Sequence, residues 1–278
     1  MSDPKAVAIK PVNRLKTVLS AESVQEQFRN ALQENAPLFI ASLIDLYSDR
    51  QLQQCEPADV VREALKAATL KLPINRNLGF AWIVPRYNSK EKRYIPQFQP
   101  GWKGIVQLAQ RTGQYRYINC GPVYEGELRS ISKLTGAMDI EGEAKSEEIV
   151  GYFAYIELLN GFSKPSFWPK AKVEAHALKY NQESKKAGKL AGNWLEYFDD
   201  RAMTTVLKHL ISKYGIMSVE MITAIADTDE RTPEARTEDE IQENANQGEV
   251  IDVEAEPVKP EENTKPEASP SQEEGPPF

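Results

Sequence analysis

The sequence has few residues of the kinds that build disulfide frameworks and metal sites. Its 278 residues include two cysteines, Cys55 and Cys120, and two histidines, His176 and His209. Two cysteines cannot form a disulfide framework, and the four residues show no spacing typical of a zinc site. We therefore expect reduced, structural cysteines and no bound metal or other cofactor.

Long hydrophobic runs and nucleotide-binding motifs are also missing. The first residues, MSDPKAVAIK, lack the apolar stretch of a secretory signal, and no run approaches about eighteen apolar residues. We therefore expect a cytoplasmic protein without membrane association. The pattern G-x-x-x-x-G-K-[ST] does not occur, which argues against an ATP-driven recombinase or helicase of the P-loop type.

Negative charge is absent from one segment of an otherwise acidic chain. The formal charge is −7, yet residues 92 to 124 contain no Asp or Glu. The acidity lies in residues 227 to 278, which hold 17 acidic and four basic residues, a net of −13, so residues 1 to 226 carry +6. A basic folded part attracts polyanions. The acid-free segment is also rich in aromatic residues: Tyr94, Phe98, Trp102, Tyr115, Tyr117 and Tyr124.

The acidic C-terminal segment, residues 227 to 278, has seven prolines and a single aromatic residue, Phe278. Such a composition buries too little apolar surface to offset chain entropy, so we expect a disordered acidic tail. Its last residues, SQEEGPPF, are similar to the acidic tip of bacterial single-stranded DNA-binding proteins, which makes Phe278 a candidate partner-binding residue. A tail that only solubilises the protein or competes with DNA through its charge is the alternative.

Hydrophobic patterning predicts an α+β domain over residues 21 to 226 that follows a flexible, irregular N-terminus over residues 1 to 20. A lysine- and glycine-rich loop over residues 183 to 193 is a candidate mobile clamp, with an ordinary flexible loop as the alternative. A β-hairpin is expected to turn at Asn160-Gly161. The predicted helices cover residues 21–36, 37–49, 57–70, 101–112, 170–182 and 194–215, and the strands cover residues 79–87, 93–99, 115–128, 147–159 and 162–168.

The helix predicted over residues 101 to 112 is the first candidate DNA contact. Lys103, Gln107 and Arg111 recur at helical spacing opposite an apolar side. The first turn, PGWKG, has no acidic residue and no strong side-chain cap, so its N–H groups are available to a phosphate. A solvated surface helix is the competing interpretation.

Two further segments are basic. Seven lysines lie between Lys164 and Lys189 against two glutamates, and the last long helix carries Arg201, Lys208 and Lys213. Any one lysine is a solvated residue by default, but the convergence of three basic segments favours nucleic-acid binding. A metal-dependent nuclease using Asp139 and Glu143, or a passive single-strand-binding protein, is the alternative function.

Several motifs, in one order, resemble the RecT family of phage and prophage recombinases. The resemblance runs from about residue 25 to about residue 225 and rests on NLGFAWIVPRYN, FQPGWKGIVQLAQRTGQYRYI, VYEGEL, VGYFAYIELLNGF, WPKAKVEAHALKY and NWLEYFDDRAMTTVLKHLISKYGIMSVEM. It implies a non-enzymatic, ATP-independent protein that binds single-stranded DNA in a basic groove and anneals complementary strands in homologous recombination. It also implies a β-β-β-α core, shared with lambda Red beta and eukaryotic annealing recombinases, with N-terminal helices and a long C-terminal helix.

The partners that the resemblance implies are single-stranded DNA, the annealed duplex and further copies of the chain in a ring or helical filament. A 5′ to 3′ exonuclease and a host single-stranded DNA-binding protein are expected as well. The N-terminal helices either form the contacts between subunits or cap the core. The residues and the resemblance together give these DNA-binding candidates: Arg86, Arg93, Trp102, Lys103, Arg111, Tyr115, Arg116, Lys170, Lys172, Arg201, Lys208 and Lys213.

The chain departs from the family pattern on the last long helix and in one strand. Met203 and Thr204 stand where relatives show two adjacent lysines, and Lys208 stands for an arginine. Tyr124 replaces an arginine of the family's V-R-EGE motif. The resemblance therefore implies no DNA contact at position 203 or 204, and Arg201, about a turn earlier, is the residue that could compensate.

Overall fold

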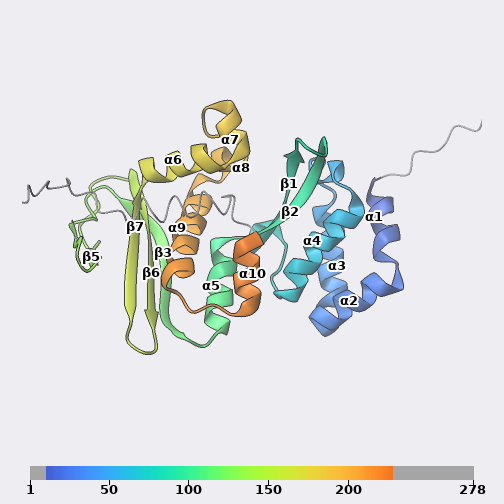
Figure 1. The fold of residues 1–278 in the computed structure, drawn as a ribbon, viewed down its shortest axis with the longest axis horizontal. Coiled ribbons are helices and arrows are strands. Elements are labelled where there is room, and N and C mark those ends of the chain that lie inside the picture. Colours follow the sequence, from blue (N-terminus) through green and yellow to red (C-terminus); the bar gives the residue numbers. More distant parts are fainter. Residues whose placement is uncertain (1–10, 228–278) are drawn as a thin grey trace, which may run out of the picture. The chain divides into compact units, whose positions relative to one another are not determined.

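The structure is a computed structural model that describes residues 11–227 (Figure 1). The chain divides into two units, residues 1–232 and 233–278, and every described residue lies in the first. The tail expected over residues 227 to 278, with Phe278, falls outside the described residues except for Asp227. None of the described helices is long and apolar enough to cross a membrane.

Four helices open the described chain: α1 (Pro11–Leu19), α2 (Glu22–Leu32), α3 (Ala36–Leu46) and α4 (Pro57–Thr69). Short 3-10 turns follow α2, precede α4 and precede the first strand: η1 (Gln33–Asn35), η2 (Leu52–Gln54) and η3 (Arg76–Leu78). The prediction of irregular chain up to residue 20 was wrong over α1, where Leu15 and Leu19 are buried at helical spacing. The helices bury their apolar sides together, with Phe28, Leu43 and Val60 inaccessible.

A hairpin and a helix connect these helices to the rest of the fold. Strands β1 (Ala81–Asn88) and β2 (Arg93–Pro100) pair antiparallel, and α5 (Trp102–Arg111) follows directly. The glycines of PGWKG allow this helix to begin against the preceding backbone. A Cβ at Gly101 would lie 2.3 Å from the Gly79 oxygen, and one at Gly104 would lie 2.1 Å from the Phe80 oxygen.

The central sheet has the strand order β3 (Tyr115–Tyr124), β6 (Ile149–Leu158), β7 (Ser163–Pro169) and is antiparallel throughout. The predicted hairpin turn is confirmed between β6 and β7, where Gly161 has a φ of 86°. Two short strands, β4 (Ser130–Ile131) and β5 (Met138–Asp139), form a separate pair. Helix α9 (Phe198–Tyr214) packs on one face of the sheet, as Figure 1 shows, which confirms the α+β class and the β-β-β-α core.

The helices after the sheet differ in part from the prediction. The expected helix α6 (Lys170–Tyr180) is present, but the expected loop 183–193 contains helix α7 (Gln182–Ala187), which ends at Gly188 with a φ of 65°. The single helix predicted over residues 194 to 215 is interrupted at Tyr197, which separates α8 (Asn193–Glu196) from α9. Helix α10 (Val219–Asp227) closes the described chain.

Candidate nucleic-acid interface

A cleft of about 470 Å³ is lined by the segment from Arg76 to Gly79, strand β1, the start of α5, helix α8 and the start of α9. Its walls come from residues as far apart in the sequence as Asp49 and Thr204. Three of the sequence-predicted candidates, Trp102, Lys103 and Arg201, lie together in this lining. The cleft therefore brings together three of the twelve predicted contacts, and the other nine lie outside its lining.

The start of α5 forms one wall of the cleft and is suited to hold an anion. Its N-cap is Gly101, no side chain caps the helix, and the first turn contains no acidic residue. Lys103 lies in this turn, with its Nζ 5.5 Å from the centroid of the Trp102 ring. Helix N–H groups and a lysine ammonium on the same turn are together a favourable environment for a phosphate oxygen.

Aromatic rings form a second wall. Trp82 of β1 and Tyr197, at the break between α8 and α9, have ring centroids 5.9 Å apart and planes inclined by 37°. Tyr197 is 47% exposed. Rings that are partly open to solvent beside cations are the arrangement on which unpaired bases stack.

The lining also contains acids, and these partly engage the other polar groups. Asp200 accepts a hydrogen bond from the indole Nε1 of Trp102 at 2.9 Å, and Asp49 pairs with Arg76. Burial alone would raise the pKa of Asp49, but the N–H of Gln51 and the Arg76 guanidinium hold that pKa below its ordinary value. The lining thus holds three acids and three cations: Asp49, Glu196 and Asp200, and Arg76, Lys103 and Arg201. The cleft therefore offers anion contacts at particular points and is not a uniformly basic surface.

Position 204 lies in the cleft and position 203 does not. Thr204 is part of the lining, and its Oγ1 donates to the Asp200 carbonyl at 2.6 Å. Met203 packs against the hydrophobic core. Arg201, which donates to the Oε1 of Gln99, places a cation in the same lining one turn earlier.

Arg111 lies at the other end of α5 and has a structural partner. Its two terminal nitrogens donate to the backbone oxygens of Leu70 and Lys71, the latter at 3.1 Å. Those carbonyls follow the last residue of α4, whose exposed acceptors require donors from elsewhere. Arg111 therefore ties α5 to the end of α4, and its role as a DNA contact stays a prediction.

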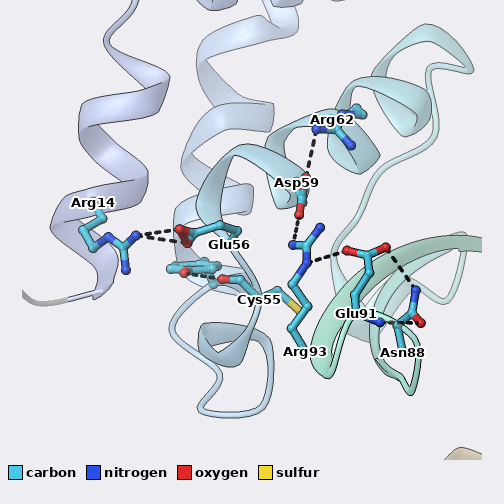
Figure 2. A network of polar contacts seen from close by, with 9 residues as sticks. Arg14, Cys55, Glu56, Asp59, Arg62, Asn88, Glu91 and Arg93 are labelled. Carbon is cyan, nitrogen blue, oxygen red and sulfur yellow. Dashed lines mark hydrogen bonds and ion pairs between the residues drawn. The ribbon is translucent and has the colours of Figure 1, made fainter.

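Two of the predicted arginines are ion-paired. Arg93 lies between Asp59 and Glu91 at 2.5 and 2.7 Å (Figure 2), and the hydrogen bond that it donates to Asp59 is the main reason that its pKa is raised. Arg116 pairs with Glu157 at 2.9 Å. Both guanidinium charges are thus partly compensated within the protein, which weakens the case for either as a phosphate contact.

The remaining candidates are spread over other surfaces. The Nη1 of Arg86 donates to Gln97 at 3.0 Å, and the hydroxyl of Tyr115 donates to the Ile216 carbonyl at 2.8 Å. Burial raises the pKa of Tyr115 to about 12. Lys170 and Lys172 lie in the first turn of α6, and Lys208 and Lys213 lie in the C-terminal half of α9. None of these six residues lines the cleft.

The two histidines and Asp139, which were considered as catalytic or metal-binding residues, contact other residues of the fold. Trp168 lies edge to face with both His176 and His209, at 5.6 and 5.0 Å between ring centroids. Asp139 lies in β5, where its carboxylate accepts from the N–H of Glu141 at 3.0 Å. Between residues 11 and 227 no three His, Cys, Asp or Glu side chains are grouped so that they could hold a metal ion.

Sequence reasoning missed three cleft residues: Arg76, Trp82 and Tyr197. Trp82 belongs to a predicted strand, but nothing in its alternation distinguishes a cleft residue from a core residue. Tyr197 lies at a helix break that periodicity did not reveal. These residues meet only through tertiary contacts among η3, β1 and the α8–α9 junction, so no local spacing relates them.

Comparison with known proteins relates this chain to one family. A model of the RecT family matches residues 37–246. The uncharacterized protein YqaK of Bacillus subtilis (strain 168) is 43% identical over 256 residues, which cover 91% of this chain and 84% of that protein. Protein RecT of Escherichia coli (strain K12) is 26% identical over 186 residues, 66% of each chain. The matched region includes the whole cleft lining.

Proposed function

This chain belongs to the RecT family, and we propose that it binds single-stranded DNA in the cleft and anneals complementary strands without nucleotide hydrolysis. Proteins of this family bind DNA and act in single-strand annealing recombination. The observation that carries the assignment to the cleft is the meeting of Trp102, Lys103 and Arg201, from two separate motifs, beside two partly open aromatic rings.

The cleft supplies contacts for both parts of a nucleotide. Lys103 and the N–H groups at the start of α5 bind one phosphate, and Arg201 binds a neighbouring one. Trp82 and Tyr197 stack on bases, which is tolerant of sequence because every base presents a flat π-face. Contacts of this kind leave the Watson–Crick edges of the bound strand available to a second strand.

Annealing then requires no catalytic residue and no ATP. A second strand is tested by base pairing, and correct pairing gains stacking energy of about 1.4 kcal/mol per step, which drives duplex formation. The protein contributes by holding the first strand extended and by neutralising part of its charge. Further copies bind along the same strand as a ring or filament, and a 5′ to 3′ exonuclease and a host single-stranded DNA-binding protein supply the strand to be paired.

The substitution Lys103→Gln tests the cleft. Loss of one phosphate contact lowers the slope of log K against log salt by about 0.7 for single strands. Lys90→Gln, which removes an exposed lysine from the β1–β2 turn, is the matched control and leaves this slope unchanged. Equal binding and equal salt slopes for the two variants would remove the cleft from the DNA-binding surface.

The same protein preparation distinguishes the two alternative functions. Labelled single-stranded DNA is incubated with the protein and magnesium, and its length and its rate of pairing with a complement are followed. Intact strands with faster pairing support annealing. Shortened products would indicate a nuclease, and intact strands that pair more slowly would indicate a passive single-strand-binding protein.

A further inference from the structure

Two adjacent acids in the first turn of α9, Asp199 and Asp200, bond to two different parts of the fold. Asp199 accepts a hydrogen bond from the hydroxyl of Tyr152, a buried residue of β6. Asp200 accepts one from the indole Nε1 of Trp102, the first residue of α5, at 2.9 Å. Adjacent side chains on a helix point about 100° apart, so the first acid reaches the sheet and the second reaches α5. The start of α9 is therefore tied to both.

The hydrogen bond between Trp102 and Asp200 joins the two walls of the cleft. Helices α5 and α9 lie side by side (Figure 1), and both residues belong to the cleft lining. Trp102 directly precedes Lys103 in the sequence, and Asp200 directly precedes Arg201. The bond therefore connects the immediate neighbours of the two cations that bind DNA phosphates in the proposed function.

The Trp102 ring also lies beside the ammonium group of Lys103, whose Nζ is 5.5 Å from the ring centroid. A cation at this distance is attracted to the face of an indole, so the orientation of the ring affects where the ammonium group lies. An indole has a single donor, its Nε1, and a carboxylate is a strong acceptor for it. Asp200 thus orients the ring, and the ring favours one position of the lysine.

The charge of Asp200 has the opposite effect on DNA binding. A carboxylate in a phosphate-binding cleft repels the DNA backbone, so Asp200 would weaken binding if its charge were its only contribution. The hydrogen bond strengthens binding, because a side chain that is already in place loses less conformational entropy when DNA binds. The two effects are separable, since asparagine offers the same acceptor oxygen without the charge.

We propose that Asp200 is a positioning residue for single-strand binding: its carboxylate holds the Trp102 indole, and the indole holds the Lys103 ammonium group at the start of α5. This inference rests on the proposed binding of single-stranded DNA in the cleft. An acidic residue here favours the binding of a polyanion, and it acts through Trp102 without contacting the DNA. Removing only the charge and removing the charge together with the acceptor therefore have different effects.

The test compares Asp200→Asn with Asp200→Ala, which lose the same charge but differ in the acceptor. Affinity of the full chain for a labelled thymidine oligonucleotide is measured by fluorescence anisotropy. We expect Asp200→Asn to bind at least as tightly as the parent, and Asp200→Ala to bind about three- to tenfold more weakly than Asp200→Asn. Glu196 also lines the cleft and provides the matched control. Glu196→Gln and Glu196→Ala likewise remove one charge, and we expect these two variants to bind alike.

The substitution Trp102→Phe shows whether Asp200 acts through the indole. Phenylalanine keeps an aromatic ring but has no N–H to donate, so we expect the difference between the Asn and Ala variants to disappear in this background. Urea unfolding is measured for every variant, and affinities are compared where each is fully folded. A loss of affinity in folded Asp200→Ala that Asp200→Asn restores, and that needs the indole, is not the result of a general loss of stability.

Equal affinities of Asp200→Asn and Asp200→Ala would overturn the proposal, because the hydrogen bond would then contribute nothing to binding. The same difference between the two variants in the Trp102→Phe background would also overturn it, because Asp200 would then act without the indole. If Lys103→Gln still lowers the salt slope in these cases, only the positioning role fails and the cleft remains the DNA-binding site. If Lys103→Gln has no effect either, the proposed function fails as well.

Discussion

Substitutions of Arg111 distinguish a residue that contacts DNA from a residue that stabilises the fold. Helix α4 ends in a turn in which the N–H of Leu72 reaches the oxygen of Ala67 and the N–H of Lys71 reaches that of Ala68. This is the Schellman pattern, in which the residue in the position of Lys71 is usually glycine because its φ is positive. Lys71 has a φ of 51° and no such freedom, so this helix end depends on additional support.

The guanidinium of Arg111 supplies that support with two hydrogen bonds to the carbonyls of Leu70 and Lys71. Hydrogen bonds that involve a charged group contribute roughly 1.5–3 kcal/mol when they are protected. Since Arg111 is exposed, we expect Arg111→Ala to lower the free energy of unfolding by about 1–3 kcal/mol. In a domain of this size that corresponds to a fall in melting temperature of roughly 3 to 9 °C.

Arg111→Lys separates charge from geometry. Lysine keeps the positive charge but cannot place two donors in the fixed fork that reaches both carbonyls. We expect a loss of stability of about 1 kcal/mol in urea unfolding, while the affinity of the folded variant for single-stranded DNA and its salt slope stay at the parental values. The reasoning is refuted if Arg111→Ala unfolds at the parental urea concentration while its salt slope falls by about 0.7, since that is the behaviour of a phosphate contact.

Three further predictions concern other parts of the domain. Gly104→Ala places a methyl group against the Phe80 carbonyl, so we expect a loss of about 1–3 kcal/mol in unfolding experiments; an unchanged melting temperature would mean that α5 does not begin so close to this backbone. Thr204→Lys adds a cation to the cleft lining, and we expect tighter single-strand binding with a salt slope steeper by about 0.7; an unchanged slope would place position 204 away from the DNA. Burial raises the pKa of Cys55 to about 11 and that of Cys120 to about 12, which favours the neutral thiols in the folded state. The stabilisation that the raised thiol pKa values contribute is fully present below the ordinary thiol pKa of 9.0 and is lost as the pH rises toward 11 to 12. We therefore expect the urea concentration at the unfolding midpoint to fall over that pH range, and to fall less in Cys120→Ala.

The sequence predicted those elements whose signals are local and strong. The apolar repeat of α4 and the Asn160-Gly161 turn between β6 and β7 belong to this group. Helix α7 was mistaken for a loop because its six residues are mostly polar, although Asn181 accepts from the N–H of Ser184 at its start and Gly188 ends it. Short helices held by their caps show little periodicity, and the buried Ser184 hydroxyl becomes evident only from its bond to the N–H of Ala191.

The sequence predicted the candidate site only where residues of the family motifs also line the cleft. Lys103 lies within the PGWKG turn, and this turn is visible in the sequence as glycines flanking a tryptophan and a lysine. The pairing of Arg93 with Asp59, 34 residues earlier, could not be read from the acid-free segment, because the compensating carboxylate comes from α4. Acidic residues from other parts of the chain therefore lie beside the acid-free segment in the folded protein, and the charge of its surface depends on them as well.

Position in the folded protein also distinguishes the two departures from the family pattern on α9, Met203 and Thr204. Adjacent residues on a helix point about 100° apart, so positions 203 and 204 face different surroundings. Here the first position holds Met203, which packs against the core, and the second holds Thr204, which belongs to the cleft lining. Only the second departure removes a charge from the cleft. Arg201, three residues before Thr204, restores a cation to the same side of the helix, and its bond to Gln99 holds the guanidinium at the wall where β2 leads into α5. The cleft thus keeps a cation from each of α5 and α9, and a strand held between them would pass the rings of Trp82 and Tyr197.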